Sequence, residues 1–470
     1  MTLRDRFKSR SPRLEDGSAT PLPQVDLEQL DGSWPPSDVA QETPSDRNVR
    51  LESELEAKRI NDAIDHELEL ERNELRKRKV NVKILLLGQA ESGKSTMLRN
   101  FQLKFTPAAF HAEAEAWRAV IDLNLVRSVT FILNVLNEGL ENGVTLSDQL
   151  RRLRVSLGPL RSVEEQLAKF LSPDDPAARV SQPGLRGFEV NVRSGSRWKS
   201  LFNRNAMATT SRSYIHGYEE VLNARRVIEA CREDMLALWT DPIVRSALDK
   251  QSVSLQFRSG FFLDEVDRIA RSGYIPSSSD ILKARIQTMG VEEHHLRMET
   301  AAESGQTWSI IDVGGSRAQR AAWVPFFDDV NVLLFLAPVS AFDQNLSEDP
   351  TVNRLWDSFL LWKTVCANKL LRHVTFILLL NKSDILDAKL KAGTPFSHFV
   401  TSYRMRPNET EHVLIYLKEK FGSIYKQNAT AGRLLHVHVT CATDSSAMDI
   451  VLLRVREVIF TTNFESADLL

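Results

Sequence analysis

The pattern of hydrophobic and polar positions changes twice along the chain. Short apolar runs that fit buried strands occur at residues 82–87 and again after residue 290, alternating there with helical stretches. Between about 107 and 280, segments rich in Leu, Ala and Glu dominate, and convincing strands disappear. This order predicts a doubly wound α/β domain that is interrupted by an all-helical insertion. Later strands are expected at Thr307–Val313, Val330–Ala337, Val374–Leu380 and Leu434–Val439, and later helices at about 353–368, 409–421 and 446–460.

The first 80 residues have a different pattern. Residues 1–46 are rich in Pro, Ser, Asp and Gln with little periodicity, which is typical of a disordered tail. Residues 47–80 are highly charged and carry apolar residues four or five positions apart, which predicts one long helix with a narrow apolar stripe. The stripe fits either a helix that lies on its own domain or a docking surface for another protein, and we favour docking.

A basic stretch interrupts the helical region at about 173–216. From Pro176 to His216 it holds seven Arg or Lys residues against one Glu, together with three glycines. We expect a long surface insertion. Its charge could meet an acidic partner or lipid, but a solvated loop is the favoured interpretation.

Composition excludes several functional classes. The chain has 470 residues, is 42% hydrophobic and carries a formal net charge of -2, which allows two or three domains and argues against nucleic acid as the main partner. We find no run of about 18 apolar residues and no signal-peptide core, so we expect no membrane span. The three cysteines are far apart in sequence and are expected to be free thiols in a reducing compartment.

The strongest chemical motif follows the first apolar run directly. The stretch Gly88–Thr96 reads GQAESGKST, which fits the phosphate-binding loop GxxxxGK[ST] between a strand and a helix. Gly88 and Gly93 let the backbone turn around an anion, so that successive N–H groups and the next helix N-terminus face phosphates. We expect Lys94 to contact the β- and γ-phosphates and the Ser95 hydroxyl to bind Mg²⁺.

Three further polar loops follow predicted strands. The run Asp312-Val313-Gly314-Gly315 places a carboxylate near a metal and a glycine N–H near a γ-phosphate. In Asn381-Lys382-Ser383-Asp384, a carboxylate such as Asp384 can accept from both N1–H and N2–H₂ of guanine, a donor pair that adenine lacks. In the run Thr440–Asp444, the Ala442 N–H is expected to bond guanine O6. Carboxyl ends of parallel strands share one edge of a sheet, so the motifs predict one nucleotide site.

Together these motifs resemble the α subunit of heterotrimeric G proteins, over roughly residues 47–470. The resemblance also includes Arg320, Trp323, Tyr274–Pro276 and the run Asp280–Thr288, which corresponds to the family's first switch. It implies a Ras-like P-loop GTPase domain at 81–106 and 281–470, with a doubly wound, mostly parallel sheet. It also implies an inserted all-α helical domain at 107–280, which covers the nucleotide.

The resemblance implies GTP or GDP and Mg²⁺ as cofactors and assigns roles to particular residues. Arg285 is the built-in arginine finger and, with Gly315 and Ser316, makes up the catalytic set. Ser95 and Thr288 are the hydroxyl ligands of Mg²⁺. Nucleotide contacts are implied for Glu91, Ser92, Gly93, Lys94, Ser95, Thr96, Leu282, Lys283, Ala284, Arg285, Asp312, Val313, Gly314, Gly315, Ser316, Asn381, Lys382, Ser383, Asp384 and Ala442.

Two departures from the family affect the predicted chemistry. The family has Gln directly after the two glycines to orient the attacking water, whereas this chain has Ser316. We therefore expect slow hydrolysis of GTP to GDP and phosphate, ~10²-fold below a typical α subunit. The alternative is a nucleotide-locked scaffold with little GTPase activity. Ala90 stands where the family usually has a third glycine, and we expect binding to survive this change.

Partners and location follow from the same resemblance. It implies a βγ dimer that docks on the 47–80 helix, a seven-helix receptor that faces the last helix, and an effector that the sequence does not identify. Thr2 follows the initiator Met, where N-myristoylation needs glycine, and no cysteine precedes Cys231. We therefore expect a cytoplasmic protein that is peripheral at the inner face of the plasma membrane through its partners.

Overall fold

The computed structural model describes residues 58–59, 80–141, 146–171, 191–193, 212–251, 253–299, 307–429 and 433–466. Its contacts divide the chain into two units, Met1–Lys77 and Arg78–Leu470, and the fold below is that of the second. The predicted tail at 1–46 lies outside the described residues. So does the predicted 47–80 helix, apart from residues 58–59, which are helical, and Val80, which begins the first strand.

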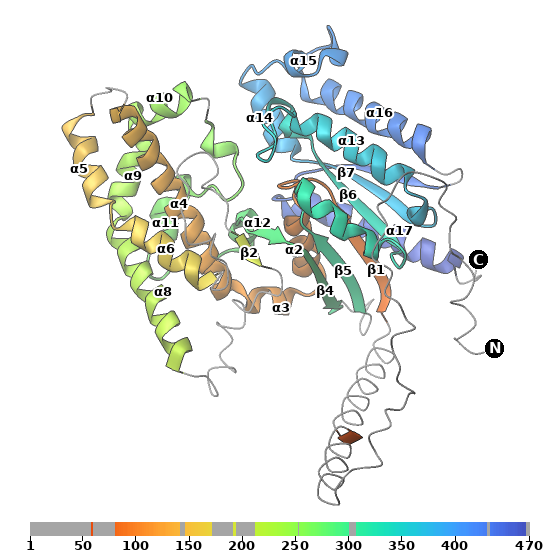
Figure 1. The fold of residues 1–470 in the computed structure, drawn as a ribbon, viewed down its shortest axis with the longest axis horizontal. Helices are drawn as coiled ribbons and strands as arrows, with labels where there is room; N and C mark the ends of the chain where they lie inside the picture. Colours follow the sequence, from red (N-terminus) through yellow and green to blue (C-terminus); the bar gives the residue numbers. More distant parts are fainter. Residues whose placement is uncertain are drawn as a thin grey trace, which may run out of the picture. The chain divides into compact units, whose positions relative to one another are not determined.

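A six-stranded sheet forms the centre of this unit (Figure 1). Its order is β4-β5-β1-β6-β7-β8, and every neighbouring pair is parallel except β4 with β5. The mostly parallel, doubly wound sheet expected from the sequence is therefore present. The strands are β1 (Val80–Leu87), β4 (Val291–Arg297), β5 (Thr307–Val313), β6 (Val332–Pro338), β7 (Thr375–Asn381) and β8 (Leu435–Thr440).

Alternate side chains of each strand face opposite layers of helices. In β1, Ile84 packs on one face with Phe101 of α2 (Lys94–Phe105), and α17 (Ser445–Ser466) adds to the same cluster. Leu85 faces the other side, in the cluster that holds Trp362 of α13 (Arg354–Ala367) and Phe421 of α16 (Thr410–Asn428). The short helices α14 (Ser383–Lys391) and α15 (Phe396–Phe399) complete this second layer. The sheet is thus covered on both faces, which explains why its inner strands are uniformly apolar.

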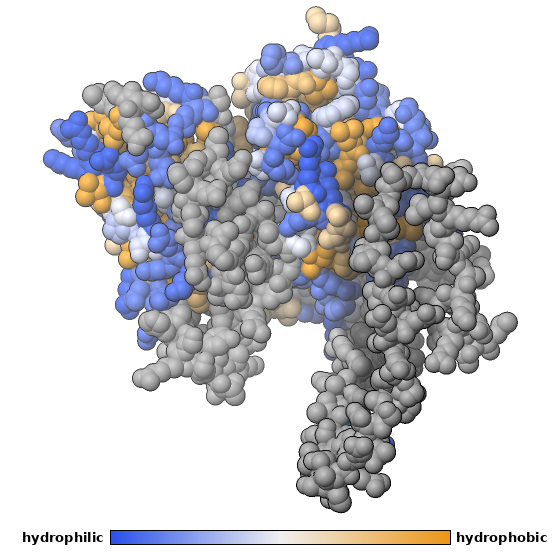
Figure 2. All heavy atoms as spheres, in the orientation of Figure 1, coloured by the Kyte–Doolittle hydropathy of each residue, from blue (hydrophilic) through white to orange (hydrophobic). Residues whose placement is uncertain are grey.

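A separate group of helices lies between α2 and β3 (Gln287–Met289) in the sequence, around its own hydrophobic cluster (Figure 1). It begins just after Thr106, close to the boundary predicted at residue 107. Its members are α3 (Pro107–Ala112), α4 (Ala114–Glu141), α5 (Asp148–Ser156), α6 (Leu160–Leu171), α8 (Arg212–Ala230), α9 (Arg232–Thr240), α10 (Pro242–Lys250), α11 (Val266–Ile269) and α12 (Ser278–Lys283). On the face drawn in Figure 2, hydrophilic side chains cover much of its outer surface.

Helix α4 is the central helix of this group, and it bears on the expectation that the chain has no membrane span. Its segment Ala114–Leu140 is long and apolar enough to cross a membrane by length and composition, but 94% of the apolar window is buried inside the protein. Polar residues such as Asp122, Asn124 and Arg127 interrupt the apolar run, so a simple count overlooks the helix. We interpret α4 as the core helix of the helical domain.

The inserted region is helical apart from one short strand in the residues that the structure describes. A three-residue strand, β2 (Asn191–Arg193), lies within the predicted basic insertion and pairs in parallel with β3. Three residues are too few to produce a visible alternation, which is why the pattern did not reveal this strand. The rest of the predicted insertion before Arg212 lies outside the described residues.

Candidate functional site

The phosphate loop connects β1 to α2 at the carboxyl edge of the sheet. Gly88 and Gly93 have φ angles of 144° and 103°, which a residue with a side chain rarely adopts. Lys94 is buried, and its Nζ donates to the carbonyl oxygens of Gly88 (3.0 Å) and Gln89 (2.8 Å). Burial lowers the pKa of Lys94 to about 8, against the opposing charge of Asp312. A phosphate bound in the loop would favour the protonated form of Lys94 and raise its pKa again.

Substitution of the third loop glycine by alanine does not disturb this backbone. Ala90 is not among the described residues with positive φ, so its side chain meets no left-handed backbone. Glu91, the next residue, has a φ of 59°. Alanine at this position therefore adopts an ordinary backbone, and the expectation that nucleotide binding survives the change stays a prediction.

A cavity of about 360 Å³ lies beside the loop, and most of the predicted site residues line it. It lies between the carboxyl edge of the sheet and residues 256–265 of the helical region. Its lining includes Glu91, Ser92, Gly93, Lys94, Ser95, Thr96, Leu282, Lys283, Ala284, Arg285, Thr288, Val313, Gly315, Ser316, Asn381, Lys382, Asp384 and Ala442. Three predicted residues, Asp312, Gly314 and Ser383, are absent from the lining, and each is adjacent in sequence to a residue that belongs to it.

Three oxygen-bearing side chains meet at one point next to the loop. The Ser95 Oγ lies 2.8 Å from Thr288 Oγ1 and donates to Asp312 Oδ2 at 2.6 Å, while Thr288 Oγ1 lies 3.2 Å from the same carboxylate oxygen. The other oxygen, Asp312 Oδ1, is buried and accepts no hydrogen bond from the described residues. Two hydroxyls and an unsatisfied carboxylate fit a hard cation such as Mg²⁺. In the described part of the chain, no cluster of three or more His, Cys, Asp and Glu offers an alternative metal site.

Arg285 reaches the cavity from the segment that follows α12. Its guanidinium donates to Glu91 Oε1 at 2.8 Å, and its side chain is 10% exposed. Burial acts to raise the pKa of Glu91, but Arg285, Arg354 and Lys382 together hold it below its ordinary value. The negative charge on Glu91 therefore keeps the Arg285 cation at the edge of the phosphate loop.

The helical region fixes the backbone of Arg285, which the sequence did not reveal. Asn124 of α4 accepts from the Arg285 N–H at 2.7 Å and donates to its carbonyl at 3.1 Å. Arg99 of α2 is also buried, and its guanidinium donates to carbonyls at the end of α12, including that of Ala284 at 2.7 Å. Burial lowers the pKa of Arg99 to about 10. No motif singles out these residues, because their role depends on contacts between distant segments.

The loops after β7 and β8 also line the cavity. Asn381 donates to the Ser92 carbonyl at 2.8 Å and accepts from the Ala442 N–H at 3.1 Å, so it braces two loops. The Ala442 amide is thus engaged by Asn381, and the expected bond to guanine O6 requires it to be shared or redirected. Burial lowers the pKa of Lys382 to about 8. The exposed Asp384 stands beside it at the cavity, and Ser383 Oγ donates to the Thr440 carbonyl at 3.1 Å.

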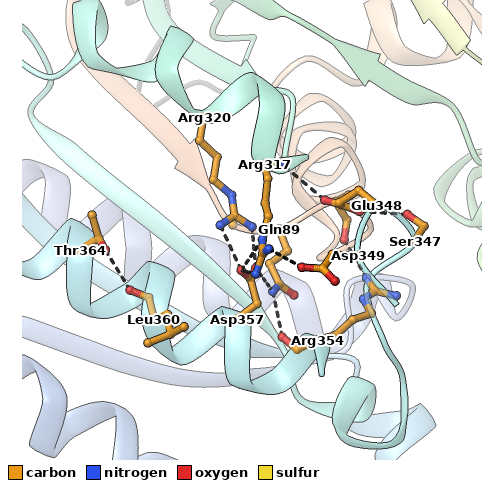
Figure 3. Close-up of polar contacts among 12 residues, drawn as sticks. Gln89, Arg317, Arg320, Ser347, Glu348, Asp349, Arg354, Asp357, Leu360 and Thr364 are labelled. Carbon is orange, nitrogen blue, oxygen red and sulfur yellow. Dashed lines mark hydrogen bonds and ion pairs between the residues drawn. The ribbon is translucent and has the colours of Figure 1, made fainter. Parts of the chain in front are cut away.

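A buried carboxylate, Asp357 of α13, links the phosphate loop to the segment after β5 (Figure 3). Arg320 donates to it at 2.5 and 3.3 Å, Arg317 at 3.2 Å through two nitrogens, and Gln89 Nε2 bonds the same group. Figure 3 shows the three side chains pointing toward Asp357 from two different elements. Asp357 was not predicted, because a single acidic residue in a helix carries no recognisable motif.

The phosphate loop lies between a strand and a helix, and polar loops follow the next parallel strands. These features define a nucleotide-binding α/β protein of the phosphate-loop class. The comparisons place it more closely. The family model described as G-protein alpha subunit matches residues 58–459, and the chain belongs to that family. The fold is accordingly a Ras-like GTPase domain with an inserted helical domain, and the protein is a guanine nucleotide-binding signal transducer.

The relatives match over most of both chains but are distant in sequence. The guanine nucleotide-binding protein alpha-4 subunit of Mycosarcoma maydis is 28% identical, over 91% of this chain and 93% of its own. A guanine nucleotide-binding protein alpha subunit of Candida albicans is 27% identical, over 88% and 96%. The alpha-2 subunit of Dictyostelium discoideum is 29% identical, over 87% and 96%.

Proposed function

We propose that this chain binds GTP with Mg²⁺ in the cavity, changes conformation and hydrolyses the nucleotide to GDP and phosphate. The observation that carries the proposal is the convergence of Lys94, Arg285 and Asp384 on one cavity. These are a phosphate-binding cation, a candidate arginine finger and a candidate guanine-reading carboxylate, and they come from three segments far apart in sequence. When bound, Mg²⁺ would neutralise phosphate charge, held by Ser95 and Thr288 with Asp312 behind them.

Base selectivity rests on Asp384. A carboxylate accepts two hydrogen bonds from the guanine edge, whereas adenine presents no such donor pair there. The test is equilibrium binding of fluorescent GDP and ADP to the wild type and to Asp384→Ala. We expect the wild type to prefer GDP by at least ~10³-fold, because a buried polar edge left unpaired is costly, and the variant to lose most of that preference. Equal affinity of the wild type for both nucleotides would refute the guanine assignment.

Hydrolysis rests on Arg285 and is limited by Ser316. The arginine would stabilise charge on the γ-phosphoryl group, and the serine is too short to orient water as a glutamine does. We expect a single-turnover rate ~10²-fold below that of an α subunit with glutamine there, which is about 2.7 kcal/mol of barrier. Ser316→Gln should raise the rate and Arg285→Ala should lower it. An ordinary rate in the wild type, or no gain in Ser316→Gln, would contradict this account.

The same assay decides between the switch and the nucleotide-locked scaffold. A scaffold would retain bound nucleotide and show no hydrolysis in the wild type or in Ser316→Gln. Retention of Arg285 and of the Ser95–Thr288–Asp312 oxygen cluster supports the switch, because a scaffold needs neither a finger nor a built metal site.

The proposed partners are a βγ dimer, a seven-helix receptor and an effector, as family membership suggests. We propose that membrane association at the inner face of the plasma membrane is indirect and occurs through these partners. Co-purification with a βγ dimer in GDP, and its release in a GTP analogue, would test the first of these assignments. No nucleotide dependence would contradict it.

A further inference from the structure

A glutamine, Gln319, follows Ser316 by three residues and lines the nucleotide cavity. It is half-buried and lines the same cavity as Lys94, Thr288 and Gly315. It belongs to η9 (Arg317–Phe326), the 3₁₀ helix that follows β5. Gly315 and Lys94 are the residues that would meet a γ-phosphate in this cavity.

The 3₁₀ geometry brings Gln319 over Ser316. Ser316 is the N-cap of η9 with extended backbone (φ -67°, ψ 154°), and its carbonyl accepts from the Gln319 N–H at 3.0 Å. Residues i and i+3 lie on the same side of a 3₁₀ turn. The Ser316 hydroxyl accordingly donates to Gln319 Oε1 at 3.0 Å. Because a hydroxyl can also accept, it can hold the carboxamide in either orientation.

Gly314 provides the space in which this carboxamide lies. A Cβ added at Gly314 would stand 2.1 Å from Gln319 Oε1 and 2.5 Å from its Cδ. Any larger residue at position 314 would push the carboxamide away. The Gly314 backbone is itself fixed, because its N–H donates to Gly290 at 2.7 Å and its carbonyl accepts from Trp323 at 2.9 Å. The carboxamide is thus seated on a fixed backbone at the end of β5.

We propose that Gln319 is the residue that orients the attacking water in this chain, with Ser316 holding its side chain. This inference rests on the GTP hydrolysis proposed above. A carboxamide offers an acceptor oxygen with two lone pairs and two N–H donors, the set that a serine hydroxyl alone does not provide. The water oxygen would form a bond to the γ-phosphorus while the bond from that phosphorus to the β–γ bridging oxygen breaks. The products are GDP and inorganic phosphate, and the water proton passes to the phosphate.

Ser316 and Gln319 would together orient the attacking water, which a single glutamine does elsewhere in the family. Ser316 would act through Gln319 and is therefore a positioning residue, whereas Gln319 would touch the water. The Gln319 side chain, held through the Ser316 hydroxyl, orients the water less rigidly than a glutamine at position 316 would. Imprecise orientation of the water slows hydrolysis. The rates should therefore rank Gln319→Ala below the wild type, and the wild type below Ser316→Gln.

The test is a double-mutant cycle on the full-length protein, preloaded with GTP and started with Mg²⁺. The rate constant of phosphate release is measured for the wild type, Gln319→Ala, Ser316→Gln and the double variant. We expect Gln319→Ala to lower the rate about tenfold in the wild-type background and less than twofold in the matched Ser316→Gln background. The dissociation constant for GDP should stay within about twofold throughout, because the carboxamide meets water and not the base or ribose. Gln319→Met, similar in length but without the amide, covers the case in which alanine disturbs η9.

Each outcome bears on the inference. An unchanged rate in both Gln319 variants, with GDP bound and GTP hydrolysed, overturns this inference and leaves the proposed function intact. An equal loss in both backgrounds also overturns it, because it would mean that Gln319 supports η9 without acting on the water. Failure of the wild type to bind or hydrolyse GTP overturns the proposed function and this inference together.

Discussion

Removal of the Asp357 carboxylate should destabilise the GTPase domain through the cluster drawn in Figure 3. Asp357→Ala leaves Arg317, Arg320 and Gln89 without their shared acceptor. Breaking a buried ion pair by removing one partner costs about 3–5 kcal/mol, and a hydrogen bond to a charged group contributes about 1.5–3 kcal/mol. The side chain of Arg317 is 37% exposed and that of Arg320 is 20% exposed, so water compensates part of the loss. We therefore expect a net cost of about 2–3 kcal/mol.

Thermal unfolding in saturating GDP measures this cost. For domains of this size, 1 kcal/mol shifts the Tm by roughly 2–4 °C, so Asp357→Ala should lower it by roughly 5–10 °C. The matched control is Asp349→Ala, which removes an exposed partner of the same Arg317, at 2.9 Å. Exposed pairs contribute little, so the control should shift the Tm far less. Asp357→Asn, which keeps the shape and removes the charge, should fall between them. Equal shifts for Asp357→Ala and Asp349→Ala would refute the reasoning that this buried cluster ties the phosphate loop to η9.

Three further results are expected from the site. Asn124→Ala removes both side-chain bonds to the Arg285 backbone, so single-turnover hydrolysis should slow about tenfold with a smaller change in GDP affinity; an unchanged rate with a loss of GDP affinity would show that Asn124 acts on binding alone. The pKa of Lys94 is about 8 in the empty protein, so nucleotide binding above that pH must take up a proton. The affinity for GDP should therefore fall by up to about tenfold per pH unit from pH 8 towards 10. An affinity that does not change with pH over this range would contradict the buried cation. Ser95→Ala should raise the Mg²⁺ concentration needed for half-maximal hydrolysis about tenfold or more, whereas Thr364→Ala, at an exposed hydroxyl that bonds its own helix, should leave it unchanged.

Strongly apolar elements were predictable from the sequence, and half-exposed ones were not. The strand Thr307–Val313 has the predicted bounds because every residue after Thr307 is buried between helix layers. The antiparallel strand β4 was missed because its sequence, VEEHHLR, is mostly polar. It lies at the end of the sheet order and pairs with β5 alone. Pairing with β5 therefore defines this strand more than its own side chains do.

The site was predictable where a short motif carries the chemistry. The phosphate loop and the loops after β5, β7 and β8 line one cavity because the parallel order of the strands brings their ends together. Asn124 and Arg99 hold the segment that follows α12, and Asp357 holds the phosphate loop and η9. Each acts from another helix, and these partners lie at least 37 residues away in sequence. The direction of Gln319 depends on the local change from strand to 3₁₀ helix, which residue spacing alone does not specify.

The most direct test of the central claim follows the switch and the chemistry in one sample. Trp323 is buried, and its indole nitrogen bonds the Gly314 carbonyl beside the cavity, so its fluorescence should report the segment after β5. In protein preloaded with GTP, we expect a fluorescence change that relaxes with the same rate constant as phosphate release after Mg²⁺ is added. Arg285→Ala should slow both signals, and Trp323→Phe should lose the first while keeping the second. Phosphate release with no matching fluorescence change, or no phosphate release from bound GTP, would contradict a GTP-hydrolysing switch.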